Sequence, residues 1–138
     1  MRHEYDDGGR QEAGFKGDAG DCFVRAVAIA TERPYREVYD EVLAFCKAEK
    51  RRKKISHPRK GVFSETAKAY LAEQGWTWVP TMGIGTGCTV HLKAEELPQG
   101  RIICSLSRHF AAVVDGVLRD SYDCSRDGTR CVYGYWKA

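Results

Sequence analysis

The sequence lacks any apolar run long enough to cross a membrane, which would take about 18 residues or more. Its first residues, Met1 to Asp7, are largely charged and contain no apolar core of a secretion signal. It also lacks the Cys-x-x-Cys pairs on which most structural zinc sites depend. These absences predict a cytoplasmic protein that does not bind membranes and needs no metal or other cofactor. Its 138 residues favour a single domain over 1–138.

Cysteine itself is not scarce, because the chain has six. Without a secretion signal we expect most of these thiols to be reduced. Cys88-x-x-His91 has the spacing of a ligand pair, and Cys124 and Cys131 would complete four zinc ligands. The last two are too widely spaced for a tight zinc knuckle, so this set is a weaker alternative to the metal-free prediction.

The net charge of +3 is unevenly distributed along the chain. Residues 47–60 hold eight Lys or Arg and one Glu, a local charge of +7 that leaves −4 for the rest. We expect segment 47–61 to be an exposed basic loop. Its most basic part is a candidate patch for an anionic partner, either nucleic acid or an acidic protein. The basic patch comprises Lys50, Arg51, Arg52, Lys53 and Lys54.

Apolar residues recur at helical spacing in the first half of the chain and alternate in the second. Helices are predicted over 22–31, from Pro34 into the basic loop, and from Ser64 to Gly75. Strands are predicted over 76–80, 89–92, 102–106, 109–114, 117–122 and 131–136. Residues 1–20 lack either period and are expected to form an irregular arm. Helices followed by strands predict an α+β fold, with N-terminal helices packed on a C-terminal antiparallel sheet.

Cys22 begins the first predicted helix, directly after Asp21, a residue type that commonly caps helix N-termini. Free backbone N–H groups and the positive end of the helix dipole lower the pKa of a thiol in a first helical turn. A cysteine presented in this way is a candidate nucleophile. The alternative is an ordinary core residue, because free cysteine is among the most buried residue types.

The hairpin around Asp115-Gly116 supplies a candidate base for Cys22. An Asp-Gly pair between two apolar runs favours a two-residue turn, and this turn sets the register of the two strands. In that register His109 and Asp120 are diagonal neighbours on one face. His109 is then the predicted general base, and Asp120 the carboxylate that orients its ring. Asp123 falls on the opposite face and is the weaker alternative.

Three segments resemble a group of small phage and bacterial proteins with a papain-like fold. They are Gly20-Asp21-Cys22-Phe23-Val24-Arg25-Ala26, Pro34-Tyr35-x-x-Val38-Tyr39, and His109 with Asp115-Gly116-Val117-x-x-Asp120. The chain is also similar, over its Cys and His–Asp segments, to the bacteriocin-leader (double-glycine) peptidases. The resemblance implies a papain-like cysteine peptidase fold and a catalytic triad of Cys22, His109 and Asp120.

We therefore expect a thiol hydrolase that cleaves a peptide, isopeptide or related amide bond through an acyl-enzyme on Cys22. The backbone N–H of Cys22 is one expected oxyanion donor. Papain-like enzymes usually place a Gln shortly before the cysteine as a second donor. Lys16 stands there in this chain, and Gln11 on the glycine-rich arm is the remaining candidate. The alternative function is a non-catalytic phage or bacterial binding or inhibitor protein that uses the basic patch.

Overall fold

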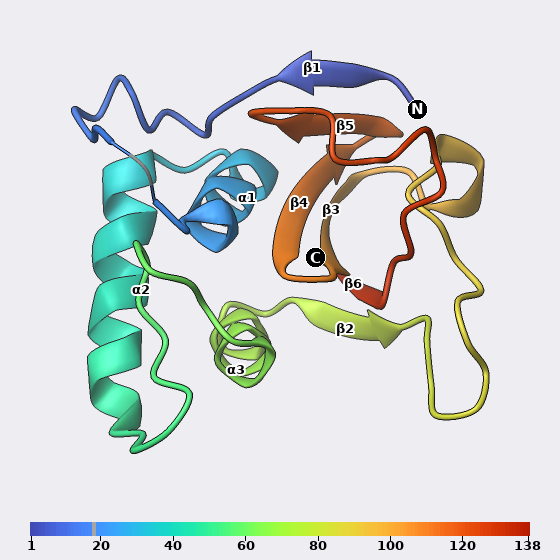
Figure 1. Ribbon diagram of the computed structural model, residues 1–138. Coiled ribbons are helices and arrows are strands. Elements are labelled where there is room, and N and C mark those ends of the chain that lie inside the picture. Colours follow the sequence, from blue (N-terminus) through green and yellow to red (C-terminus); the bar gives the residue numbers. More distant parts are fainter. Residues whose placement is uncertain (18) are drawn as a thin grey trace.

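The computed structural model describes residues 1–17 and 19–138, and Asp18 of the predicted arm lies outside the described residues. The described part contains three α-helices beside a six-stranded sheet (Figure 1): α1 (Cys22–Thr31), α2 (Tyr35–Glu49) and α3 (Ser64–Glu73). The strands are β1 (His3–Tyr5), β2 (Thr77–Pro80), β3 (Arg101–Leu106), β4 (His109–Val114), β5 (Val117–Asp120) and β6 (Gly134–Lys137). A short 3-10 helix, η1 (Ala94–Glu96), precedes β3. The α+β class predicted from the sequence is confirmed.

The strands lie in the order β1-β5-β4-β3-β6-β2. The pairs among β2 to β6 are antiparallel, but β1 runs parallel to β5, with Tyr5 opposite Asp120. The sheet is therefore mixed, and the prediction of an antiparallel sheet with an irregular arm was wrong at this edge. β1 is only three residues long and its sequence, His-Glu-Tyr, has no alternating apolar pattern, so no local signal marked it as a strand.

The apolar core has two parts, one on each face of the sheet. On one face α1 packs against β4, and Figure 1 shows α2 and α3 on the same side. α1 is apolar around most of its circumference, as expected for a helix enclosed by its neighbours. The other face of the sheet is covered by the segments that carry Leu92, Leu97 and Val132. The central strands are thus buried on both sides, which fixes the start of β4 in space.

Several element boundaries differ from those predicted. α2 continues to Glu49, because Lys47, Ala48 and Glu49 are good helix formers, and the basic loop begins only at Lys50. Ser64 is the first residue of α3 rather than its cap. The strand predicted over 89–92 is reduced to a single bridge between His91 and Cys131.

Gly134 marks a close approach between β6 and β2. A Cβ added at Gly134 would lie 2.2 Å from Cη2 of Trp78, whose ring therefore needs a glycine beneath it. Trp78 then packs against Trp136 with 4.5 Å between the ring centroids and the two rings tilted by 46°. This aromatic pair joins the edge strand β2 to the core.

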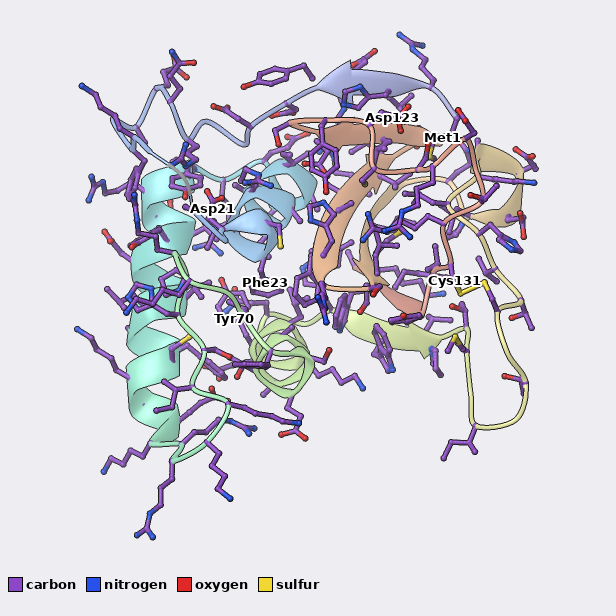
Figure 2. The ribbon with its side chains drawn as sticks, in the orientation of Figure 1. Met1, Asp21, Phe23, Tyr70, Asp123 and Cys131 are labelled. Atoms are coloured by element: carbon purple, nitrogen blue, oxygen red, sulfur yellow. A yellow bond between two sulfur atoms is a disulfide. The ribbon has the colours of Figure 1, made fainter. Side chains whose placement is uncertain are left out.

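Two of the six cysteines, Cys88 and Cys131, form a disulfide, drawn in yellow beside the Cys131 label in Figure 2. The other four are free thiols, in keeping with the expectation that most cysteines are reduced. The disulfide excludes the alternative zinc set, because it occupies Cys88 and Cys131 and because Cys124 lies beside His109 instead. Within the described residues, no helix combines the length and the apolar character needed to cross a membrane.

Candidate active site

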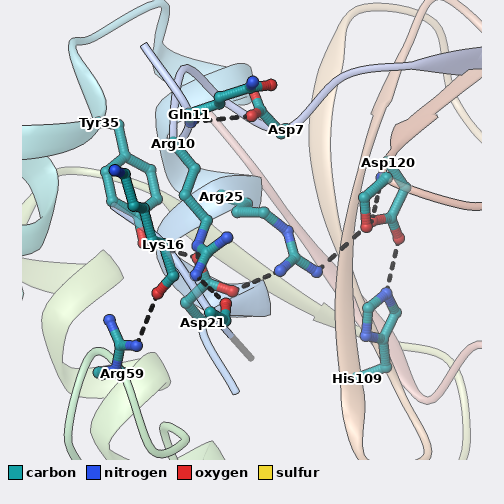
Figure 3. Close-up of polar contacts among 12 residues, drawn as sticks. Asp7, Arg10, Gln11, Lys16, Asp21, Arg25, Tyr35, Arg59, His109 and Asp120 are labelled. Atoms are coloured by element: carbon teal, nitrogen blue, oxygen red, sulfur yellow. Dashed lines mark hydrogen bonds and ion pairs between the residues drawn. The ribbon is translucent and has the colours of Figure 1, made fainter. Parts of the chain in front are cut away.

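Cys22 is the first residue of α1, as predicted, and its thiol is free and half-buried. Asp21 occupies the N-cap position, but its side chain makes no capping hydrogen bond. Instead the Asp21 carboxylate is buried and turned toward side chains from other parts of the chain (Figure 3). The predicted position of Asp21 before the helix is confirmed, but the capping role expected of its side chain was wrong.

The Asp21 carboxylate is shared by three partners. The hydroxyl of Tyr35 donates to Oδ2 at 2.6 Å, and Arg10 Nε lies 3.2 Å from the same oxygen. Arg25, one helical turn further along α1, donates to Oδ1. Burial and this hydrogen bond to Asp21 raise the pKa of Tyr35 above its usual value, so Tyr35 remains a donor at neutral pH. The start of α1 is therefore fixed by an ion pair with the N-terminal arm and by a hydrogen bond from α2.

His109 and Asp120 are adjacent at the start of β4 and the end of β5. His109 Nε2 and Asp120 Oδ2 are 2.6 Å apart, and both side chains are more than nine-tenths buried. The hairpin register is the one that the Asp115-Gly116 turn predicts, with Ala112 opposite Arg119. The remaining Asp120 oxygen accepts the Ser121 backbone N–H at 2.7 Å. Both carboxylate oxygens are thus held, which fixes the plane and tilt of the imidazole.

The pKa values of His109 and Asp120 shift from their usual values in opposite directions. Burial lowers the pKa of His109, but hydrogen bonding to Asp120, and to the thiols of Cys124 and Cys22, raises it more, and the net direction is upward. Burial raises the pKa of Asp120, but the bond to His109 and the charge of Arg25 lower it below its usual value. The pair is therefore an imidazolium facing a carboxylate at neutral pH.

Cys22 and His109 both line one cleft of about 490 Å³ between α1, the segment 60–64 and the turn before β4. Since Nε2 of His109 is bonded to Asp120, Nδ1 is the ring nitrogen left to engage the Cys22 thiol. The ring of Tyr122 lies 5.5 Å from that of His109, centroid to centroid, and covers it on another side. The Cys22 thiol and a ring nitrogen of His109 thus both border the open space of the cleft.

Several residues around the pair were not singled out from the sequence. Arg25 reaches from α1 to within 3.7 Å of Asp120 Oδ1, and Figure 3 shows it between the two aspartates. β1 holds Asp120 from its other side, where His3 Nε2 and the Asp6 N–H contact the Asp120 carbonyl at 2.9 and 3.0 Å. Only Arg25 had a sequence signal, because it stands four residues after Asp21 on one helix face.

Cys124 is a further unpredicted neighbour. Its sulfur, a ring nitrogen of His109 and a carboxylate oxygen of Asp120 all lie within 4.8 Å of one another. Nitrogen, oxygen and sulfur ligands in such a set suit Zn²⁺. A metal there would compete with the hydrogen bond that joins His109 to Asp120.

The other predicted residues lie elsewhere. Asp123 accepts hydrogen bonds from the backbone N–H and hydroxyl of Ser125, at 3.0 and 2.6 Å. Gln11 is exposed in a turn of the arm, with its backbone N–H bonded to Asp7, and it is not among the residues lining the cleft. The structure thus brings Cys22, His109 and Asp120 together but does not bring Gln11 to them.

The basic patch lies beyond the end of α2 and is only partly free. Arg51 is paired with Glu65 at 2.8 Å and with Glu49 at 3.4 Å. Arg52, Lys53 and Lys54 are exposed. Their charges are therefore available to an anionic partner, but the pairing of Arg51 reduces the positive charge of the patch.

No protein-family model matches this chain. Comparisons with curated proteins and with solved structures also found no match.

Proposed function

We propose that the protein is a papain-like thiol hydrolase that cleaves a peptide, isopeptide or related amide bond, with Cys22, His109 and Asp120 as its triad. The observation that carries this proposal is the cleft shared by Cys22 and His109, with the His109 ring bonded to buried Asp120. A thiol, a base and a carboxylate that orients the base are the parts that acyl transfer requires.

In the first half of the reaction Cys22 attacks the substrate carbonyl carbon as a thiolate, while the imidazolium of His109 holds the proton at Nδ1. The negative charge that develops on the carbonyl oxygen is stabilised by the Cys22 backbone N–H, since the first N–H groups of a helix have no intrahelical acceptor. His109 then gives its proton to the leaving amine as the C–N bond breaks. The product of this half is a thioester on Cys22.

In the second half a water molecule attacks the thioester. His109 takes a proton from the water and returns it to the Cys22 sulfur as the C–S bond breaks, which releases the carboxylic acid. Asp120 stabilises the imidazolium whenever it forms, because its Oδ2 accepts a hydrogen bond from the Nε2–H of His109. The bond to His109 and, to a smaller extent, the charge of Arg25 lower the pKa of Asp120 and keep it ionised.

Competitive alkylation tests the nucleophile directly. We expect iodoacetamide at neutral pH to modify Cys22 much faster than Cys46 or Cys104, as measured by peptide mass spectrometry. Burial raises the pKa of Cys46 to about 11 and that of Cys104 further still, so neither forms much thiolate. Equal, slow labelling of all three cysteines would contradict the proposal.

Substitution of His109 tests whether this residue is the base for Cys22. His109→Ala is expected to slow Cys22 labelling by about tenfold, because the thiolate loses its imidazolium partner. His57→Ala is the matched control, since His57 is held by a short loop, with its Nδ1 bonded to the Arg59 backbone N–H. Cleavage itself is measured as new termini in a mixed peptide pool, with Cys22→Ala protein as the blank.

The alternative function, a non-catalytic binding or inhibitor protein that uses the basic patch, predicts the opposite effects of substitution. It predicts that Cys22→Ala leaves function intact, while neutralising Arg52, Lys53 and Lys54 abolishes a salt-sensitive interaction. The same two variants therefore discriminate between the two functions.

A further inference from the structure

The cleft beside Cys22 and His109 is lined by apolar and basic residues. Five of its twelve lining residues are large and apolar, and two of these, Ile55 and Phe63, are 64% and 46% exposed. The charged lining residues other than His109 are Lys60 and Arg108, both cations. Among the described residues, no Asp or Glu lines this cleft. A surface that is apolar and basic together favours a partner that is apolar and acidic.

Lys60 and Arg108 supply the positive charge of the cleft lining. Each is exposed, and within residues 1–17 and 19–138 neither forms an ion pair. Arg108 lies in the turn directly before His109, and Lys60 lies in the loop that faces Cys22. The two cations thus come from separate segments of the chain and line the same cleft as Cys22 and His109.

The Lys60 side of the cleft is held firmly in place. The Gly20 backbone N–H donates to the Arg59 carbonyl at 2.7 Å, and a Cβ at Gly20 would lie 2.9 Å from the Lys60 carbonyl oxygen. His57 and Gly61 close the loop through a pair of backbone hydrogen bonds, each 2.9 Å long. The backbone that carries Lys60 therefore has a defined position relative to the start of α1.

We propose that the cleft takes an extended peptide segment in which acidic residues stand next to a large apolar side chain. The apolar side chain packs between Ile55 and Phe63, and the acidic residues face Lys60 and Arg108. This inference deepens the proposed function, on which it rests, by naming the substrate class of the same site. It also separates the basic residues that act at the site from the basic patch at Lys50–Lys54.

Binding by Cys22→Ala protein tests the proposal without turnover. The probes are three fluorescein-labelled hexapeptides, of alternating Leu and Glu, Leu and Lys, or Ser and Glu, and the readout is fluorescence anisotropy. We expect the Leu–Glu peptide to bind about tenfold more tightly than either of the others. Its advantage over the Leu–Lys peptide should shrink as salt is added, because exposed charges are screened.

Charge reversal identifies the residues responsible. Lys60→Glu with Arg108→Glu should make the Leu–Lys peptide the better ligand. Arg52→Glu with Lys53→Glu changes the net charge equally, outside the cleft, and should leave the preference intact. Equal binding of the three peptides, or the same loss in both double variants, would overturn the proposal.

The two proposals fail in different ways. Fast, selective alkylation of Cys22 without a preference for the Leu–Glu peptide would leave the hydrolase standing and reject the acidic substrate. A clear peptide preference with an unreactive Cys22 would reject hydrolysis and leave a peptide-binding cleft.

Discussion

Arg25 on α1 lies with Nη2 3.7 Å from Oδ1 of Asp120, while its Nη1 donates to Asp21. One guanidinium therefore links the carboxylate at the start of the Cys22 helix to the carboxylate that holds His109. All three side chains are largely buried, so their charges are weakly screened. The helix and the hairpin are joined by charge as well as by apolar packing.

Replacing Arg25 should therefore cost far more than replacing a surface arginine. Arg25→Met leaves two buried carboxylates with one partner fewer, and we expect a loss of about 3 kcal/mol in the free energy of unfolding. Arg119→Met is the control, because Arg119 pairs with Glu4 at the more exposed edge of the sheet and should cost about 1 kcal/mol or less. Urea denaturation measures both, and equal losses would show that the Arg25 link does not stabilise the fold.

Asp120→Asn should lower the pKa of His109. The hydrogen bond to Asp120 is the largest effect that raises this pKa, and burial, which lowers it, remains in the variant. In a ¹⁵N NMR titration the wild-type ring should stay protonated well above pH 6.5, and the variant ring should lose its proton nearer that value. Asp123→Asn should change nothing at His109. A shift in the Asp123 variant alone would mean that the orienting carboxylate has been misassigned.

The same pair predicts how stability depends on pH. The raised pKa of His109 gives stability that is complete below pH 6.5 and is lost as the pH rises through the folded-state value. The lowered pKa of Asp120 gives stability that is complete above pH 3.8 and is lost on acidification. The difference in unfolding free energy between wild type and Asp120→Asn should thus be largest between these limits and should decline above pH 6.5. If this difference in unfolding free energy increased above pH 6.5, the direction assigned to the His109 pKa shift would be wrong.

Reduction of the Cys88–Cys131 disulfide should lower the free energy of unfolding by about 2–4 kcal/mol, since it closes a long loop. The bond joins residues 43 positions apart. Thermal melting with and without a phosphine reductant measures the change. Protein with Cys88→Ser and Cys131→Ser should melt identically under both conditions. Sensitivity to reductant in that double variant would trace the effect to another cysteine.

Gly134→Ala tests the close contact between β6 and Trp78. The new methyl group would overlap the Trp78 ring, and we expect a loss of about 1–3 kcal/mol in unfolding free energy. Gly83→Ala is the matched control, because its added Cβ meets nothing closer than Thr86 Oγ1 at 3.7 Å. Chemical denaturation followed by Trp fluorescence would also report any displacement of Trp78 from Trp136. Equal stability of the two variants would show that β2 shifts freely to make room.

The sequence predicted best what short-range signals determine. The bounds of α1 follow from Asp21, the apolar run and the residues after it, and the approach of Asp120 to His109 follows from one Asp-Gly turn. Both features depend on neighbours within about a dozen residues. Local chemistry was enough to place them.

The missed features are contacts between distant residues. β1 pairs with β5, Arg10 reaches Asp21 and Cys88 bonds to Cys131 only because the tertiary fold brings them together. Cys124 approaches His109 for the same reason, through an irregular segment without periodic pattern. No local pattern distinguishes these partners from other residues of the same type.

The pairing of β1 with β5 has a consequence for the order of folding. His3 and Asp120 are 117 positions apart, so their contact closes nearly the whole chain. During synthesis β1 leaves the ribosome well before β5, the strand with which it pairs. The α1 helix, with its thiol, can form long before the carboxylate is secured behind His109. Cys22 is therefore in place before His109 gains its carboxylate partner, and assembly of the proposed triad waits until β5 has been synthesised.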